Sequence, residues 1–226
     1  MLDSPDGVCP GQARFEYPAT SVLFSNYYLY ISDAKLDMLY GQIPNPILKR
    51  LAREATIDLK VLKLSLRDEP TEANRYGRLS VVSKHLARNA QVTGLDQPPG
   101  GWLHATIPLR WARANDAVFF AGSRGINVVG LVGSIKHVLG GFRPDGTPVG
   151  GTAATIMEIY NKRGATGTDA ILDEGSLSFV EELVESMAGG EQRMEFLAKT
   201  IDYKPSAKTY GRRVVLATPL YVTLSN

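Results

Sequence analysis

The feature that most constrains the fold is the apolar segment near the C-terminal end of the chain. It reads RRVVLATPLYVTL over residues 212–224, and Pro219 interrupts it. A strand that is apolar on both faces is normally covered on both sides. It also needs partner strands, and the candidates lie N-terminal to residue 135. We therefore expect a single domain in which the last strand returns to a sheet formed earlier in the chain.

Apolar periodicity and turn residues predict the remaining elements. Strands are expected at 27–32, 57–66, 102–112, 116–123 and 126–134. Helices are expected at 34–43, 47–55, 72–89, 152–163, 176–190 and 191–201. Pro108 cannot donate a ladder hydrogen bond, so its strand is expected at a sheet edge or a bulge. The order of elements predicts an α+β fold: a mixed, largely antiparallel sheet of about six strands with helices packed on it.

The composition excludes several classes of protein. The chain has 25 Lys and Arg against 23 Asp and Glu, which does not indicate a nucleic-acid partner. No run of residues is long and apolar enough for a membrane span. With one cysteine, an intramolecular disulfide is excluded, and we expect a cytoplasmic protein. Residues 1–26 are rich in Pro, Gly, Asp and Ser, so we expect a disordered leader followed by one domain over 27–226.

The sequence shows no motif for a metal or a cofactor. The histidines, His85, His104 and His137, are not spaced as zinc ligands with each other or with Cys9. Neither a P-loop nor a nucleophile elbow is present. We therefore expect no metal and no cofactor.

The first candidate site follows the strand at 126–134. Gly133 and Ser134 end an apolar run, and Lys136 and His137 follow in a helix-like turn. Backbone N–H groups at such a turn, with the Ser134 hydroxyl and the Lys136 ammonium, would suit a phosphate or a carboxylate. In the alternative interpretation, Gly133 makes room for packing, Ser134 caps a helix and Lys136 is solvated.

The second candidate site is the polar face of the strand at 102–112. Alternation places Trp102, His104, Thr106 and Arg110 on one face. An aromatic ring, an imidazole and a guanidinium together could hold an aromatic or anionic ligand. The same side chains could equally form a solvated or helix-covered surface.

Several stretches resemble an uncharacterised bacterial family that is known as a domain of unknown function. They are YYLYISDAKLDMLYGQIP at 27–44, IPLRW at 107–111, VVGLVGSIKHVLG at 128–140 and ATPLYVTL at 217–224. The resemblance implies a single folded unit and brings no established activity, ligand or catalytic residue.

Three functional hypotheses remain open. The first is a binding or regulatory protein for a small anionic ligand at Gly133, Ser134, Lys136 and His137, with Trp102 and Arg110 as further ligand-binding candidates. The second is a hydrolase or transferase with His104 or His137 as general base. The third is an interaction subunit that binds protein partners, or a second copy of itself, through the acidic helix 176–187 and an exposed sheet edge.

Overall fold

The computed structural model describes residues 27–54, 72–114, 117–140, 176–187, 189–205 and 212–225. The expected leader at 1–26, strand at 57–66 and helix at 152–163 lie outside these residues. None of the helices in the described part of the chain combines the length and apolar character that crossing a membrane requires.

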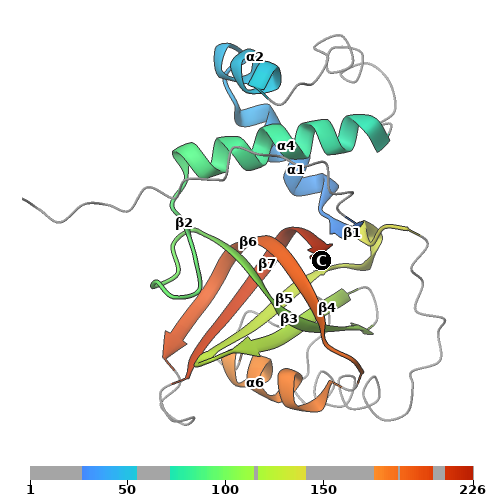
Figure 1. Cartoon of the computed structure of the whole chain (residues 1–226), viewed down its shortest axis with the longest axis vertical. Coiled ribbons are helices and arrows are strands. Elements are labelled where there is room, and N and C mark those ends of the chain that lie inside the picture. Colours follow the sequence, from blue (N-terminus) through green and yellow to red (C-terminus); the bar gives the residue numbers. More distant parts are fainter. Residues whose placement is uncertain are drawn as a thin grey trace, which may run out of the picture.

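The described strands form one seven-stranded sheet that closes on itself. The strands are β1 (Tyr27–Ile31), β2 (Val92–Thr93), β3 (Trp102–Ala114), β4 (Ala117–Arg124), β5 (Asn127–Ser134), β6 (Gln192–Pro205) and β7 (Arg213–Leu224). The order runs β1-β7-β5-β4-β3-β2, and β6 pairs with both β3 and β7. Strands β3, β4, β5, β7 and β6 therefore make a closed barrel, in which only the β5–β7 pairing is parallel (Figure 1).

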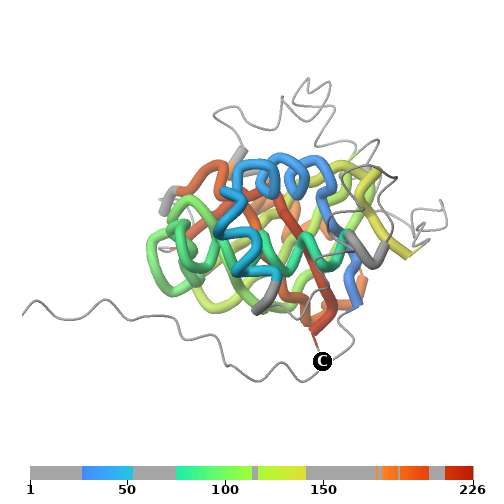
Figure 2. The backbone as a smooth tube through the Cα atoms, turned by 90° about the horizontal axis from the view of Figure 1, so that it is seen from above, coloured from blue at the N-terminus to red at the C-terminus, as the bar shows by residue number. Residues whose placement is uncertain are grey.

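Helices cover the barrel at two places. Helices α1 (Asp33–Gln42), α2 (Asn45–Glu54) and α4 (Glu72–Asn89) lie together at one end, and α6 (Ser176–Ser186) lies at the other (Figure 1). The view from above shows the first three helices lying across the strands (Figure 2). A short 3-10 helix, η1 (Ile135–His137), follows β5.

The strand alternation sorts the side chains into an interior and two outer cores. The barrel interior holds Leu103, Ile107, Leu131, Phe196 and Val222, among others. The outer face of β4, β5 and β7 packs against Val180 and Leu183 of α6. The outer face near α1 and α4 contributes Trp102, Leu197 and Tyr221 to a third core. Strand β7 supplies residues to all three cores, which confirms that it is covered on both faces.

The α+β class and the single domain are confirmed, while two details of the sheet differ from expectation. The sheet has seven strands and closes into a barrel. Residues 191–201, expected as a helix, lie largely in strand β6, because Met194, Phe196 and Ala198 alternate into the barrel. Pro108 lies in the part of β3 that pairs with β6 alone, because the ladder between β3 and β4 covers only Arg110–Ala114. Its missing N–H therefore removes no hydrogen bond to β4.

Two glycines in β5 allow close packing. A Cβ on Gly130 would lie 2.8 Å from Val180 of α6, and a Cβ on Gly133 would lie 2.5 Å from the Tyr30 hydroxyl oxygen. Both glycines therefore make room for a neighbouring side chain. The position of Gly133 brings the end of β5 against the end of β1, and the candidate site lies at this junction.

Candidate functional site

The segment Gly133–His137 is built into the junction between β5 and β1. Gly133 pairs with Val118 in the β4–β5 ladder. The backbone N–H of Lys136 donates to the Ser134 hydroxyl at 3.4 Å, so this amide already has a partner. The next residue after η1, Val138, forms a bridge with Tyr30 of β1. The turn is thus fixed against β1, and His137 is held beside the start of α1.

Charged side chains from three segments meet at this junction, and we call them the Asp33 cluster. Its members are Asp33, Lys35 and Asp37 of α1, Arg75 and Arg78 of α4, and Lys136 and His137 of η1. Arg75 donates to both carboxylate oxygens of Asp33, from Nε at 2.8 Å and from Nη2 at 3.0 Å. His137 Nδ1 lies 3.9 Å from Asp33 Oδ2. Arg78 donates to Asp37, one helical turn further along α1.

Lys35 joins the cluster to strand β7. Its Nζ donates to the carbonyl oxygen of Pro219 at 3.3 Å and lies 3.5 Å from Ser32 Oγ. Burial lowers the pKa of Lys35, because the charged ammonium loses contact with water. The positive charge of Lys35 is therefore partly desolvated within the cluster.

His137 is a weak base in this environment. Burial is the largest cause that lowers its pKa from 6.5; Asp33 raises it, and Lys35, Arg75 and Lys136 lower it further. The cationic neighbours outnumber the single carboxylate that acts on the ring. An anion added to the cluster would oppose these charges and raise the pKa of His137.

Below the charged groups lies a buried hydroxyl. The Tyr30 side chain is fully buried, and its hydroxyl makes no hydrogen bond of normal geometry. Burial raises its pKa to about 12, although the nearby Ser32 side chain and Ser134 backbone act in the opposite direction. The ring packs edge-on against Phe120, with centroids 6.1 Å apart, and against His137, with centroids 6.0 Å apart. Tyr30 is therefore a fixed, neutral donor and acceptor below the cluster.

A second polar group lies on the outer face of the barrel. His104 of β3 donates from Nε2 to Glu195 Oε1 of β6 at 3.1 Å, and the Tyr221 hydroxyl of β7 donates to the same oxygen at 2.7 Å. The hydrogen bond from His104 is the main cause that lowers the pKa of Glu195; burial opposes it, and Tyr221 assists. Glu195 is thus an ionised carboxylate that orients an imidazole and a phenol.

The structure does not bring Trp102 and Arg110 together. Trp102 is buried in the core below α1 and α4, with Lys199 Nζ 5.8 Å from its ring centre. Arg110 donates to the Met187 carbonyl oxygen at 2.9 Å and to Glu191 at 3.1 Å, beside the end of α6. Eight residues of extended strand separate them by roughly 27 Å. The polar face of β3 therefore forms separate local environments along the strand.

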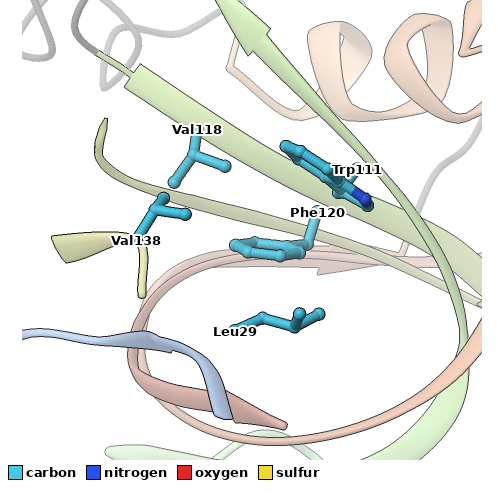
Figure 3. A pocket seen from close by; sticks show the side chains of 5 residues that line it. All are labelled: Leu29, Trp111, Val118, Phe120 and Val138. Carbon is cyan, nitrogen blue, oxygen red and sulfur yellow. The ribbon is translucent and has the colours of Figure 1, made fainter. Parts of the chain in front are cut away.

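A small apolar pocket lies among side chains of β1, β3, β4 and the residue after η1 (Figure 3). Leu29, Trp111, Val118, Phe120 and Val138 line it. Its volume of about 10 Å³ corresponds to one water molecule. The pocket offers no polar group and is too small for a ligand. Among the described residues, no group of three His, Cys, Asp or Glu side chains is arranged to hold a metal ion.

Sequence reasoning did not assign Tyr30, Lys35, Arg75, Glu195 and Tyr221 to a site. A signal for the arginines was present, because Arg75 and Arg78 are one turn apart in α4 and face Asp33 and Asp37, one turn apart in α1. This spacing puts each pair on one face of its own helix, but it does not show that the two faces meet. The contacts of Glu195 had no local signal, because its partners come from two other strands.

Comparison with known proteins places the chain in a family. No curated protein and no solved structure matches it. The model of one family, described as "Family of unknown function (DUF7019)", matches residues 26–226. This match includes every stretch on which the resemblance was based. The chain belongs to this family of unknown function.

Proposed function

We propose that the protein binds a small anionic ligand, which bears a phosphate or a carboxylate, at the Asp33 cluster. The carrying observation is the excess of positive charge at the β5–β1 junction. The cluster contains four basic side chains, Lys35, Arg75, Arg78 and Lys136, and only two carboxylates, Asp33 and Asp37. Partly desolvated cations interact more strongly with an added anion than exposed ones do.

Two unpartnered polar atoms support the proposal. The Tyr30 hydroxyl and Arg78 Nε are buried and make no hydrogen bond of normal geometry, although Ser32 and the Ser134 backbone approach the Tyr30 hydroxyl. An unsatisfied buried polar group costs about 1–3 kcal/mol, so such groups are uncommon without a role. An anion with oxygen acceptors beside Arg78 would supply a partner of the kind that its Nε lacks.

The test is isothermal titration with phosphate, sulfate, acetate and citrate at constant ionic strength. We expect at least one of these anions to bind, with an affinity that falls about threefold to tenfold in the double variant Ser134→Ala/Lys136→Ala. Lys49→Ala is the matched control, because Lys49 is exposed on α2 and is not among the charges that act on His137. If no anion binds, or if the double variant binds as the unmodified chain does, the proposal is wrong.

The cellular setting is part of the same proposal. The single cysteine is compatible with a reducing cytoplasm, and the resemblance implies a bacterial source. A regulatory role follows if ligand binding moves η1, because η1 connects the barrel to β1 through the Tyr30–Val138 bridge. Hydrogen exchange of residues 134–139 with and without the anion measures this movement.

A second candidate function is supported by the His104–Glu195–Tyr221 group. A carboxylate that orients an imidazole is a common element of general-base catalysis. This arrangement favours a hydrolase or a transferase in which His104 is the base and Glu195 its positioning residue. The test is hydrolysis of p-nitrophenyl esters and p-nitrophenyl phosphate. Turnover that His104→Gln abolishes and His85→Gln leaves unchanged supports this candidate, while absence of turnover contradicts it.

A further inference from the structure

The position of Asp33 narrows the class of anion that the proposed site would accept. Asp33 lies among the cations of the cluster, and its side chain is 39% exposed. Arg75 donates one hydrogen bond to each of its oxygens. A carboxylate has about four lone-pair positions, so Asp33 retains acceptor capacity beyond the bonds from Arg75. The same surface that attracts an anion therefore also presents a negatively charged acceptor.

A carboxylate acceptor distinguishes oxyanions by whether they carry a proton. Sulfate has only acceptor oxygens in the neutral pH range, so each of its oxygens repels the Asp33 carboxylate. Hydrogenphosphate has nearly the same size, shape and charge, but one of its oxygens carries a hydrogen. This P–OH group can donate a hydrogen bond to the Asp33 carboxylate. A site that is built to bond a hydroxyl rejects an analogue without one, because its polar group is then left unpaired.

On these grounds we propose that Asp33 makes the site selective for a phosphoryl group that carries a proton, as in hydrogenphosphate or the monoanion of a phosphate monoester. This inference rests on the proposed anion-binding function and adds the chemical class of the ligand. The cations Lys35 and Lys136 supply the attraction, and Asp33 supplies the selection. Arg75 is a positioning residue, since its two bonds fix the plane of the Asp33 carboxylate.

The same cluster contains a matched carboxylate. Asp37 lies one turn further along α1, pairs with Arg78, and has a side chain that is 60% exposed. It therefore resembles Asp33 in charge and in its arginine partner. His137 approaches Asp33 and not Asp37, which places Asp33 closer to η1. Replacement of each carboxylate by its amide separates a specific contact from a general change in charge.

The experiment compares phosphate with sulfate by isothermal titration at pH 7.5 and constant ionic strength. We expect phosphate to bind about tenfold to a hundredfold more tightly than sulfate. The ratio of the two affinities stays in this range because water partly screens the exposed Asp33 carboxylate. In Asp33→Asn the ratio is expected to fall to within about threefold, because the amide donates to sulfate as well as to phosphate. Asp37→Asn also removes a negative charge from the cluster, so it is expected to raise both affinities together and to leave the phosphate-to-sulfate ratio unchanged. Circular dichroism of each variant checks its fold.

A second comparison identifies the source of the phosphoryl group and does not depend on any variant. At pH 5.5, methyl phosphate and dimethyl phosphate are both monoanions, but only methyl phosphate carries a hydroxyl. Tighter binding of methyl phosphate than of dimethyl phosphate supports selection of a monoester. Tight binding of inorganic phosphate alone indicates the free ion as ligand.

The outcomes separate the two proposals. If phosphate and sulfate bind the unmodified chain within threefold of each other, the selectivity inference is wrong and the anion-binding function stands. Binding of carboxylates without phosphate likewise contradicts only the inference. Absence of binding by every anion overturns both.

Discussion

Tyr30→Phe is expected to stabilise the protein. The ring is fully buried, and its hydroxyl has no hydrogen-bond partner of normal geometry. Removal of an unsatisfied buried hydroxyl is worth about 1–3 kcal/mol. Because the Ser32 side chain and the Ser134 backbone lie nearby, we take the lower end, about 1 kcal/mol. For a chain of this size, that gain corresponds to a rise in Tm of about 2–4 °C.

The gain from Tyr30→Phe should grow with pH. Burial raises the pKa of Tyr30 from 10.0 to about 12. Above pH 10 the phenol ionises in the unfolded chain while it stays neutral in the folded one, so the unfolded state is favoured as the pH rises. Relative to its value below pH 10, the free energy of unfolding of the protein falls by about 1.4 kcal/mol at pH 11 and by about 2.7 kcal/mol once the pH has passed 12, because Tyr30 ionises more easily in the unfolded chain. Phenylalanine cannot ionise and escapes this loss.

The assay is urea unfolding followed by circular dichroism between pH 7.5 and pH 11. Tyr76→Phe is the control, because Tyr76 is 40% exposed and its replacement should change the free energy of unfolding by less than about 0.5 kcal/mol. A loss of 1 kcal/mol or more in Tyr30→Phe at pH 7.5 would refute the reasoning, since it would mean that the hydroxyl is well satisfied. A gain in stability together with weaker anion binding would show that the hydroxyl is retained for function.

Three further predictions follow from packing and charge. Gly122→Ala should destabilise the fold by about 3 kcal/mol or more in urea unfolding, because a Cβ there would lie 2.2 Å from a backbone carbonyl oxygen of β3. By contrast, Gly41→Ala should raise the free energy of unfolding by about 0.5–1 kcal/mol, because Gly41 lies within α1 and a Cβ there would have no neighbour within 4 Å. The lowered pKa of His137 means that the unfolded chain takes up its proton first as the pH falls below 6.5, so stability should decline towards pH 5. His137→Gln should reduce this decline in stability. An equal reduction in His85→Gln would contradict the assignment of the decline to His137. Leu183→Ala should lose about 2–5 kcal/mol, because Leu183 is fully buried between α6 and the barrel; a loss below 1 kcal/mol would show that α6 is not part of the cooperative fold.

Strong local patterns identified the elements that local physics determines. Helix α4 begins and ends at the expected residues, 72 and 89, because its buried stripe has an uninterrupted helical period. Strands β4 and β5 were expected at 116–123 and 126–134, and the turn between them contains Gly125, whose φ of 59° glycine adopts without strain. The inward and outward faces of β3 also follow the alternation of its residues.

The site itself could be predicted only in part. The sequence indicated Lys136 and His137 as candidate site residues, because they follow an apolar strand that ends in Gly-Ser. It could not show that Asp33, 42 residues before Arg75, would lie between that arginine and His137. Contacts of this kind depend on how the helices pack on the barrel. The group of His104, Glu195 and Tyr221 likewise needs three strands that lie far apart in the chain.

Strand β6 shows most clearly where the sequence alone is insufficient. The residues from Met194 to Ile201 fit a helical stripe and an alternating strand almost equally well, so local propensity leaves the element undecided. The hydrogen bonds of β6 to β3 and β7 decide it, and they also close the barrel. Along the strongly periodic strands, the local pattern of apolar residues is sufficient to predict which side chains are buried. Closure of the sheet and the meeting of charged residues at the β5–β1 junction depend on how distant segments pack in the folded chain, because backbone pairing and charge contacts between such segments have no counterpart in local sequence.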